Sequence, residues 1–199
     1  MIQKKKAVIA LLISMLLSAC TAIEKSTYPQ DWPAIDLTVT DCSAISGVYD
    51  SAAELQTHRH PRQDVLLALT LLPPGEYLKQ VRSVSLQVKN HERVAVHALA
   101  EDGAVLAERS YRIGDGFFRC EDGALIVNPD NMPDKQRAPD NPVVGITRNR
   151  ISLHKAQDGA LIMQEAGSAT GLAFLLVPVH VQSEEWYLFR LWRKVPTTP

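Results

Sequence analysis

The sequence contains few of the motifs that identify an enzyme. It has no H-E-x-x-H, P-loop or G-x-G-x-x-G pattern, so the motifs of zinc proteases, P-loop nucleotide enzymes and dinucleotide enzymes are missing. The stretch GSATG at 167–171 departs from the G-x-S-x-G of a nucleophile loop and lacks strand-turn-helix surroundings, so we expect a hairpin connection there. An isolated Asp or Glu could still catalyse a reaction, but nothing distinguishes one. The sequence therefore predicts no catalytic residue and no cofactor.

Basic clusters are also scarce. The chain has 21 Lys and Arg against 22 Asp and Glu, for a formal net charge of −1. Beyond Lys4, Lys5 and Lys6 no basic patch occurs, which argues against nucleic-acid binding. A hydrophobic content of 46% excludes wholesale disorder.

No apolar run is long enough to form a membrane-spanning helix. The longest, Ala7–Leu17, is interrupted only by Ser14 and is roughly half of the ~20 residues that a spanning helix needs. Three lysines precede it and small residues follow it, which is typical of a secretory signal. The alternative, a buried N-terminal helix, fits three adjacent lysines less well.

Leu17-Ser18-Ala19-Cys20 resembles the lipobox of bacterial lipoproteins, directly behind this apolar run. The resemblance covers residues 1–20 alone and does not identify the family of the domain behind it. It implies cleavage before Cys20, a diacylglyceryl group on the Cys20 sulfur and acylation of the new amino group. Thr21, in place of an Asp associated with inner-membrane retention, implies sorting to the outer membrane. Two or three acyl chains would anchor the chain without spanning the bilayer.

This resemblance also divides the chain. About 180 residues remain after the signal, a usual length for one domain with its own core, and their net charge is −1 − 3 = −4. Tyr28 and Trp32 lie in a polar tether and are candidates to dock onto the domain or onto headgroups. The expected parts are a signal peptide at 1–19, a lipidated N-terminus and tether at 20–41, a single β-rich domain at 42–195 and a tail at 196–199.

Few cysteines are present, and the lipoprotein resemblance assigns one of the three to lipid. Cys42 and Cys120 then remain as an even pair in an oxidising compartment, which predicts a disulfide between them. Two free thiols or a metal site are the alternatives, although neither cysteine has the CxxC partner that would favour metal.

Metal-ligand patterns are weak. His58 and His60 would lie on the same side of an extended segment, as a metal pair requires, but no third ligand is nearby and Pro61 indicates a solvated loop. We therefore predict no metal site and name these two histidines only as weak candidates.

A proline-rich stretch at 128–142 is the longest predicted loop. Loops of this length are usually functional or disordered, so we consider it for partner contact as well as a plain solvated loop. Asp130, Asn131 and Asp134 offer oxygens that suit Ca²⁺, but their spacing lacks the Asp-x-Asx-x-Asx-Gly pattern of a calcium loop.

From Val81 onward the hydrophobic period is two, which predicts β-strands. Asp-Gly-Ala occurs at 102–104, 122–124 and 158–160, and Asp-Gly favours hairpin turns with positive φ. We expect a mainly β fold: an antiparallel meander forming a curled sheet or small barrel, with one short helix. Beyond 113 the expected strands are 117–121, 124–128, 143–154, 160–165, 172–181 and 186–193.

The short helix is expected at Gln63–Leu72, capped by Asp64 and ended by Pro73-Pro74-Gly75, with a buried strand as the alternative. Leu172–Val177 is expected at the centre of the sheet, with Pro178 at a bulge or strand end. The apolar residues of 186–192 lie on both strand faces, and burial of both faces is the favoured reading.

Together these observations predict an outer-membrane lipoprotein facing the periplasm that is not an enzyme and binds or scaffolds another envelope component. The first alternative is a carrier whose barrel interior, lined by Leu172, Phe174 and Trp186, holds a lipid or another apolar molecule. The second is an enzyme of unknown class.

Overall fold

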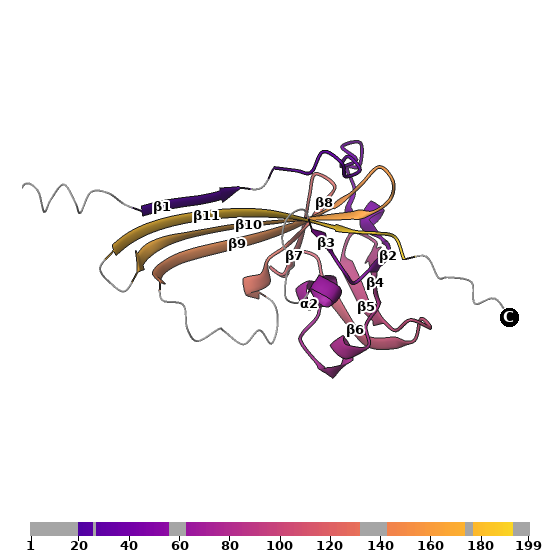
Figure 1. Ribbon diagram of the computed structural model, residues 1–199. Helices are drawn as coiled ribbons and strands as arrows, with labels where there is room; N and C mark the ends of the chain where they lie inside the picture. The colour runs from indigo at the N-terminus through magenta and orange to yellow at the C-terminus, as the bar shows by residue number, and fades with distance from the viewer. Residues whose placement is uncertain (1–19, 26, 56–62, 132–142, 174–176, 193–199) are drawn as a thin grey trace, which may run out of the picture.

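Two β-sheets share one core, and the larger sheet continues beyond that core (Figure 1). The computed structural model describes residues 20–25, 27–55, 63–131, 143–173 and 177–192. The predicted mainly β fold is confirmed: the named strands pair antiparallel, except that β1 runs parallel to β11. Within the described residues neither sheet closes into a barrel, so the curled-sheet form of the prediction holds.

The larger sheet has the strand order β1-β11-β10-β9-β8-β7, with β3 paired to β11. Its strands are β1 Cys20–Lys25, β3 Glu54–Leu55, β7 Phe118–Glu121, β8 Ala124–Val127, β9 Val143–Lys155, β10 Leu161–Ala173 and β11 Val177–Phe189.

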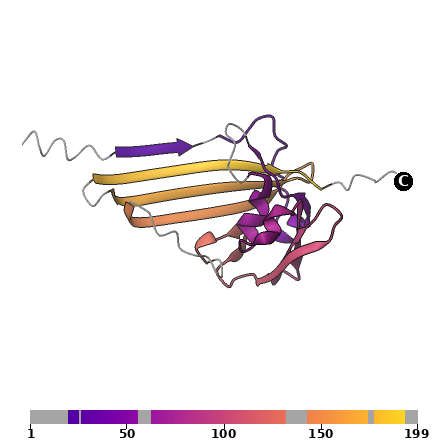
Figure 2. The same cartoon turned by 60° about the horizontal axis from the view of Figure 1, so that its bottom comes forward.

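The smaller sheet has the order β2-β4-β5-β6. Its strands are β2 Gly47–Asp50, β4 Ser83–Lys89, β5 Arg93–Leu99 and β6 Val105–Arg112. The helical segments are η1 Cys42–Ile45, η2 Gln63–Val65, α2 Leu66–Leu71, η3 Glu76–Lys79 and η4 Pro129–Asn131. Figure 2 shows the long strands β9, β10 and β11 side by side, with α2 and the smaller sheet at one end of them.

All three Asp-Gly-Ala sequences form the predicted hairpin turns, joining β5 to β6, β7 to β8 and β9 to β10. In the first and third turns Gly103 and Gly159 each have a φ of +90°, and the preceding Asp carboxylate accepts a hydrogen bond of 2.9 Å from the following Ala N–H. In the second turn Asp122 and Gly123 have φ values of +48° and +77°, as a type I′ turn requires. The same tripeptide therefore forms two kinds of turn.

The helix is shorter than predicted. It covers Leu66–Leu71 after the 3₁₀ turn Gln63–Val65, and no side chain caps it, so the prediction that Asp64 is the cap is wrong. Packing stabilises this short helix instead of a cap. Leu72 is already extended, as expected of a residue before proline, so Pro73 ends the helix as predicted. The buried side chains of the helix are Leu66, Leu67, Ala68 and Leu71.

The bounds of the last two strands, β10 and β11, differ from the predicted ones. The predicted hairpin connection at 167–171 is wrong, because this stretch lies within β10, where Gly167 pairs with Asn149 and Ser183. The predicted strands 172–181 and 186–193 are likewise wrong, because β10 ends at Ala173 and β11 is continuous from Val177 to Phe189. Small and polar residues form this part of β10, which neither core cluster of the described residues includes, and they hide the hydrophobic alternation that marks a strand.

The prediction for Leu172 holds in part. This residue lies in β10, an inner strand of the larger sheet, but its side chain is 42% exposed. Pro178 is the second residue of β11, opposite Leu172, which agrees with the predicted position at a strand end. Phe174 lies outside the described residues. At the other end of β11 the predicted burial of both faces holds for Tyr187, Leu188 and Phe189.

The main core lies between the two sheets and α2. The smaller sheet contributes Val84, Leu86, Val94 and Val96, the helix contributes Leu67 and Leu71, and the larger sheet contributes Phe118, Leu125, Leu153, Leu161 and Phe189. The predicted disulfide is confirmed: Cys42 in η1 is bonded to Cys120 in β7, with Cα atoms 6.0 Å apart, so the segment before β2 is tied to the larger sheet.

A second cluster covers the opposite face of the larger sheet. Its buried members are Ala156, Ala160, Ile162 and Leu188, and its partly buried members are Tyr28, Trp32, Ile35 and Trp186. The ring of Tyr28 lies edge-on to that of Trp186, with centroids 5.1 Å apart. The Asp36 N–H donates to the Lys155 carbonyl and the Gln157 N–H to the Ala34 carbonyl, each at 2.9 Å. The segment that the sequence presented as a tether thus packs on the sheet from Tyr28 onward.

Candidate functional site

One part of the larger sheet is a single layer. We call it the blade: residues 143–149 of β9, 167–173 of β10 and 177–183 of β11, which lie opposite one another in the register of the sheet. Both core clusters of the described chain lack blade residues. In Figure 1 these strands project away from the smaller sheet, with β1 alongside β11. The strands are thus held in the blade by backbone pairing, and Ile146, Arg148, Leu172 and Val181 present exposed side chains there.

The β9 side of the blade is an open sheet edge. β8 pairs with β9 only from Ile151 to Leu153, and residues 143–150 have no strand partner on that side among the described residues. The Ala156 N–H donates to the Ala160 carbonyl, and bonded positions alternate along an antiparallel pair, so even-numbered residues of β9 bond to β10. Odd-numbered residues, including Thr147, direct their backbone groups to the open edge. Such an edge is a template for another strand.

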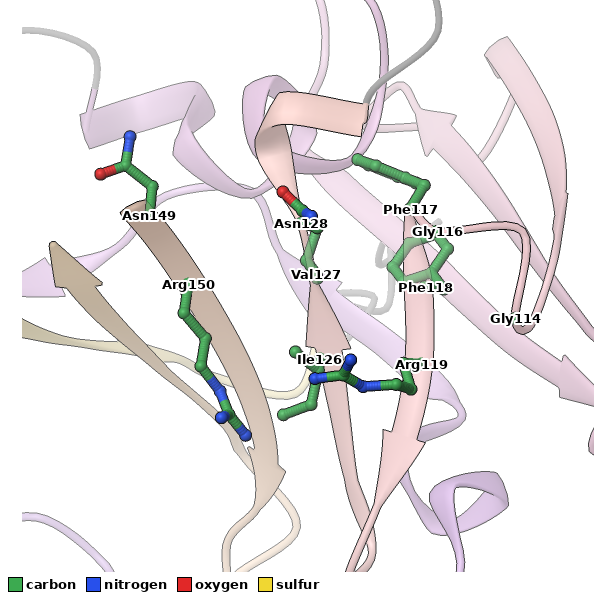
Figure 3. A pocket seen from close by; sticks show the side chains of 10 residues that line it. All are labelled: Gly114, Gly116, Phe117, Phe118, Arg119, Ile126, Val127, Asn128, Asn149 and Arg150. Carbon is green, nitrogen blue, oxygen red and sulfur yellow. The ribbon is translucent and has the colours of Figure 1, made fainter. Parts of the chain in front are cut away.

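A cleft of about 280 Å³ lies where β8 separates from β9. Its residues come from the turn before β7, from β7 itself, from the end of β8 and from β9 (Figure 3). They are Gly114, Gly116, Phe117, Phe118, Arg119, Ile126, Val127, Asn128, Asn149 and Arg150. The cleft therefore adjoins the point at which the open edge begins.

The charged groups of the cleft carry an excess of positive charge. Arg119 Nε lies 2.5 Å from one oxygen of the Glu121 carboxylate, and an Arg150 terminal nitrogen lies 2.6 Å from the other. Figure 3 shows both arginine side chains extending toward Ile126 from the strands on either side of β8. Arg148, which is exposed, follows on the same face of β9. One carboxylate thus balances two guanidinium groups, and a third lies close by, which suits an anionic ligand group.

A chain of polar side chains crosses the same face of the sheet. The His154 Nε2 lies 3.1 Å from the Ser152 hydroxyl, which donates to the Gln164 amide oxygen at 3.1 Å, and Gln164 donates in turn to Glu184 at 2.7 Å. Burial, with the nearby charge of Arg150, lowers the pKa of His154. Because Ser152 gives its proton to Gln164, the imidazole Nε2 is a donor to Ser152 and not its base. The arrangement therefore does not activate Ser152 as a nucleophile.

The structure separates the residues that the sequence singled out. Cys20 begins β1, and Asp130 and Asn131 lie in η4, where the Asn131 amide donates to the Gly116 carbonyl at the rim of the cleft at 3.0 Å. His58, His60 and Asp134 lie outside the described residues. No group of three or more metal-ligating residues occurs in the described part of the chain.

The residues proposed to line a carrier's barrel are likewise not brought together. Leu172 lies in the blade opposite Pro178, whereas Trp186 lies at the other end of β11 against Tyr28.

Sequence reasoning missed the cleft, although it named the loop that borders it. Arg119 and Arg150 are far apart in the chain and meet only through the order β7-β8-β9. The one local signal was the run Arg148-Asn149-Arg150, which places charge inside a predicted strand.

Comparison of the chain with protein-family models, curated proteins and solved structures found no match. Among the described helices, none is long and apolar enough to span a membrane.

Proposed function

We propose that the protein is a lipid-anchored component of the bacterial outer membrane, facing the periplasm, that binds an extended segment of another envelope protein and is not an enzyme. The open β9 edge with the cationic cleft at its base carries this proposal. Lipid attachment at Cys20 is supported by the lipobox residues Leu17–Cys20 and by the apolar run before them.

The open edge supports a partner bound as an added strand. Backbone hydrogen bonds supply affinity in this mode of recognition, and side-chain contacts supply specificity. A strand antiparallel to β9 would place its side chains opposite Ile146 and Arg148, which are both exposed. The partner segment that complements these two side chains has an apolar residue opposite Ile146 and an acidic residue opposite Arg148, two positions apart.

The cleft supports a carboxylate at one end of that segment. Arg119 and Arg150 share a single carboxylate, so a second one can pair with them without displacing Glu121. Both side chains are more than half exposed, so their present ion pairs are weak and easily rearranged.

Site-specific photo-crosslinking in cells tests this function. A photo-reactive amino acid at Arg148 should capture an envelope protein, whereas the same group at Gln157, in the exposed turn at the far end of β9, should not. Failure to capture any envelope protein at Arg148, or equal capture at both positions, contradicts the proposal.

A backbone substitution separates strand addition from side-chain contact. Thr147→Pro removes an outward N–H while keeping an edge position where proline is tolerated, and it should abolish the crosslink at Arg148. Thr147→Ala keeps that N–H and should leave the crosslink intact. Equal crosslinking in the two variants contradicts strand addition.

The anchor is tested separately. Cys20→Ser should prevent acylation, seen by mass spectrometry of the N-terminal peptide, and should move the protein from the membrane fraction to the soluble fraction. An unchanged membrane fraction contradicts the anchor.

A further inference from the structure

Exposed apolar side chains are concentrated at the free end of the blade. Half of the exposed large hydrophobic residues of the described chain lie there: Ile146 is 68% exposed, Leu172 42% and Val181 38%. The others are scattered over the rest of the molecule, at Leu37, Val105 and Leu191. Ile146 and Leu172 lie on one face of the blade and Val181 on the other, so apolar groups are exposed on both faces of this end. Exposed apolar residues gathered in one region usually mark an interaction site.

The composition of the blade changes along its strands. Nearest the core, the row Arg148–Ser168–Gln182 and the row Asn149–Gly167–Ser183 are polar apart from the glycine. Toward the free end, three further rows contain in turn Val181, Ile146 and Leu172. The polar pair at this level, Thr170 and His180, is joined by a hydrogen bond of 2.8 Å, which lowers the cost of removing both groups from water.

The predicted lipid-attachment residue lies at this same end. β1 runs parallel to β11 from Cys20, which is opposite Val179, to Lys25, which is opposite Glu184. Cys20 is therefore at the level of the apolar residues, and the strand leads from it toward the core. An acyl group on Cys20 would bring a lipid surface to the place where the apolar side chains are exposed.

We propose that the free end of the blade, around Ile146, Leu172 and Val181, lies in the headgroup region of a lipid bilayer. Lipid is favoured over other binding partners because of the anchor at Cys20, so this inference rests on the proposed function. The polar rows that follow, including the row of Arg148, then face the aqueous side.

The open edge limits how deeply this end enters the bilayer. Unpaired backbone groups are strongly unfavourable in hydrocarbon, and β9 carries such groups along its free edge. The rows that hold these apolar residues extend over three residue steps of β9, from Thr147 at the level of Val181 to Val144 at the level of Leu172, or about 10 Å of strand. This length matches the shallow burial typical of interfacial segments.

Fluorescence quenching by brominated lipids tests the contact without native acylation. The mature Cys20→Ser chain is tethered by an N-terminal histidine tag to vesicles of phosphatidylethanolamine and phosphatidylglycerol that contain a nickel-chelating lipid. An environment-sensitive dye is attached to Leu172→Cys or, as a matched control, to Gln157→Cys. Brominated lipids should quench the dye at 172 and leave the dye at 157 unquenched.

Lack of quenching at 172 on tethered vesicles overturns the proposal. Because the histidine tag replaces the acyl anchor, this result does not depend on whether Cys20 is acylated in cells. The lipid contact of the blade and the anchor at Cys20 are therefore tested independently. If the dye at 172 is shielded without vesicles, and the shielding increases with protein concentration, the free end of the blade binds a second copy of the protein. This result also overturns the proposal.

A variant with serine at Ile146, Leu172 and Val181 adds a second readout. The untethered Cys20→Ser chain should lose roughly tenfold in vesicle affinity for each side chain replaced. The same number of serine substitutions at Leu37, Val105 and Leu191 should leave the affinity unchanged. An equal loss in both variants overturns the proposal.

Discussion

Strands β9, β10 and β11 have two different surroundings along their length. Near the β9–β10 turn, Leu153, Leu161 and Phe189 are fully buried in the main core, whereas in the blade Ile146, Leu172 and Val181 are exposed. Pairing continues without a break from one region to the other. Side-chain packing therefore stabilises the first region, whereas backbone hydrogen bonds hold the strands of the second, where apolar side chains are exposed.

The largest expected effect is on the region with the core. Replacing both Cys42 and Cys120 with serine should lower the free energy of unfolding by about 4.5 kcal/mol, because the disulfide closes a loop with a sequence separation of 78. Urea denaturation of the variant and of the native chain measures the difference. A loss below about 1 kcal/mol would show that the disulfide contributes little to this region.

A leucine pair on adjacent strands compares the two regions directly. Leu153→Ala in the core should cost about 3 kcal/mol of unfolding free energy, because it leaves a cavity around a fully buried side chain. Leu172→Ala in the blade should cost less than about 0.5 kcal/mol. Equal losses in thermal or urea unfolding would mean that the blade is covered in solution.

A pair of glycine substitutions tests the close contact between Gly123 and the Val39 carbonyl group. Gly103→Ala should cost about 1 kcal/mol, because the φ of +90° is unfavourable for alanine while no atom lies within 4 Å of the new methyl group. Gly123→Ala should cost more, because its methyl group would meet the Val39 carbonyl oxygen at 2.1 Å. Urea midpoints of the two variants give the comparison, and an equal loss would argue against this contact.

The smallest expected effect is a pH dependence from His154, near the β9–β10 turn. Burial lowers the pKa of His154 below its usual 6.5, so the unfolded chain binds more protons than the folded one in this range. The contribution of His154 to stability should be fully present above pH 6.5 and should be lost as the pH falls through the folded-state pKa. Urea midpoints measured over this range should depend less on pH in His154→Gln, and an unchanged pH dependence would contradict the assignment.

Local signals in the sequence were the most informative. Each Asp-Gly-Ala turn depends on a few adjacent residues, and all three hairpins were predicted correctly. The missed strand bounds lie in the blade, where Gly167–Gly171 has the composition of a turn but is held in β10 by two neighbouring strands. The cleft could not be predicted either, since Arg119 and Arg150 are brought together only by sheet order.

The parallel pairing of β1 with β11 has a mechanical consequence. A pull on Cys20 directed away from the core acts along β1, so the strand is loaded in shear against β11. All six register pairs from Cys20–Val179 to Lys25–Glu184 then share the force, instead of opening one after another like a zipper. A protein held at Cys20 and pulled at its other end by a partner would therefore resist extension at this junction.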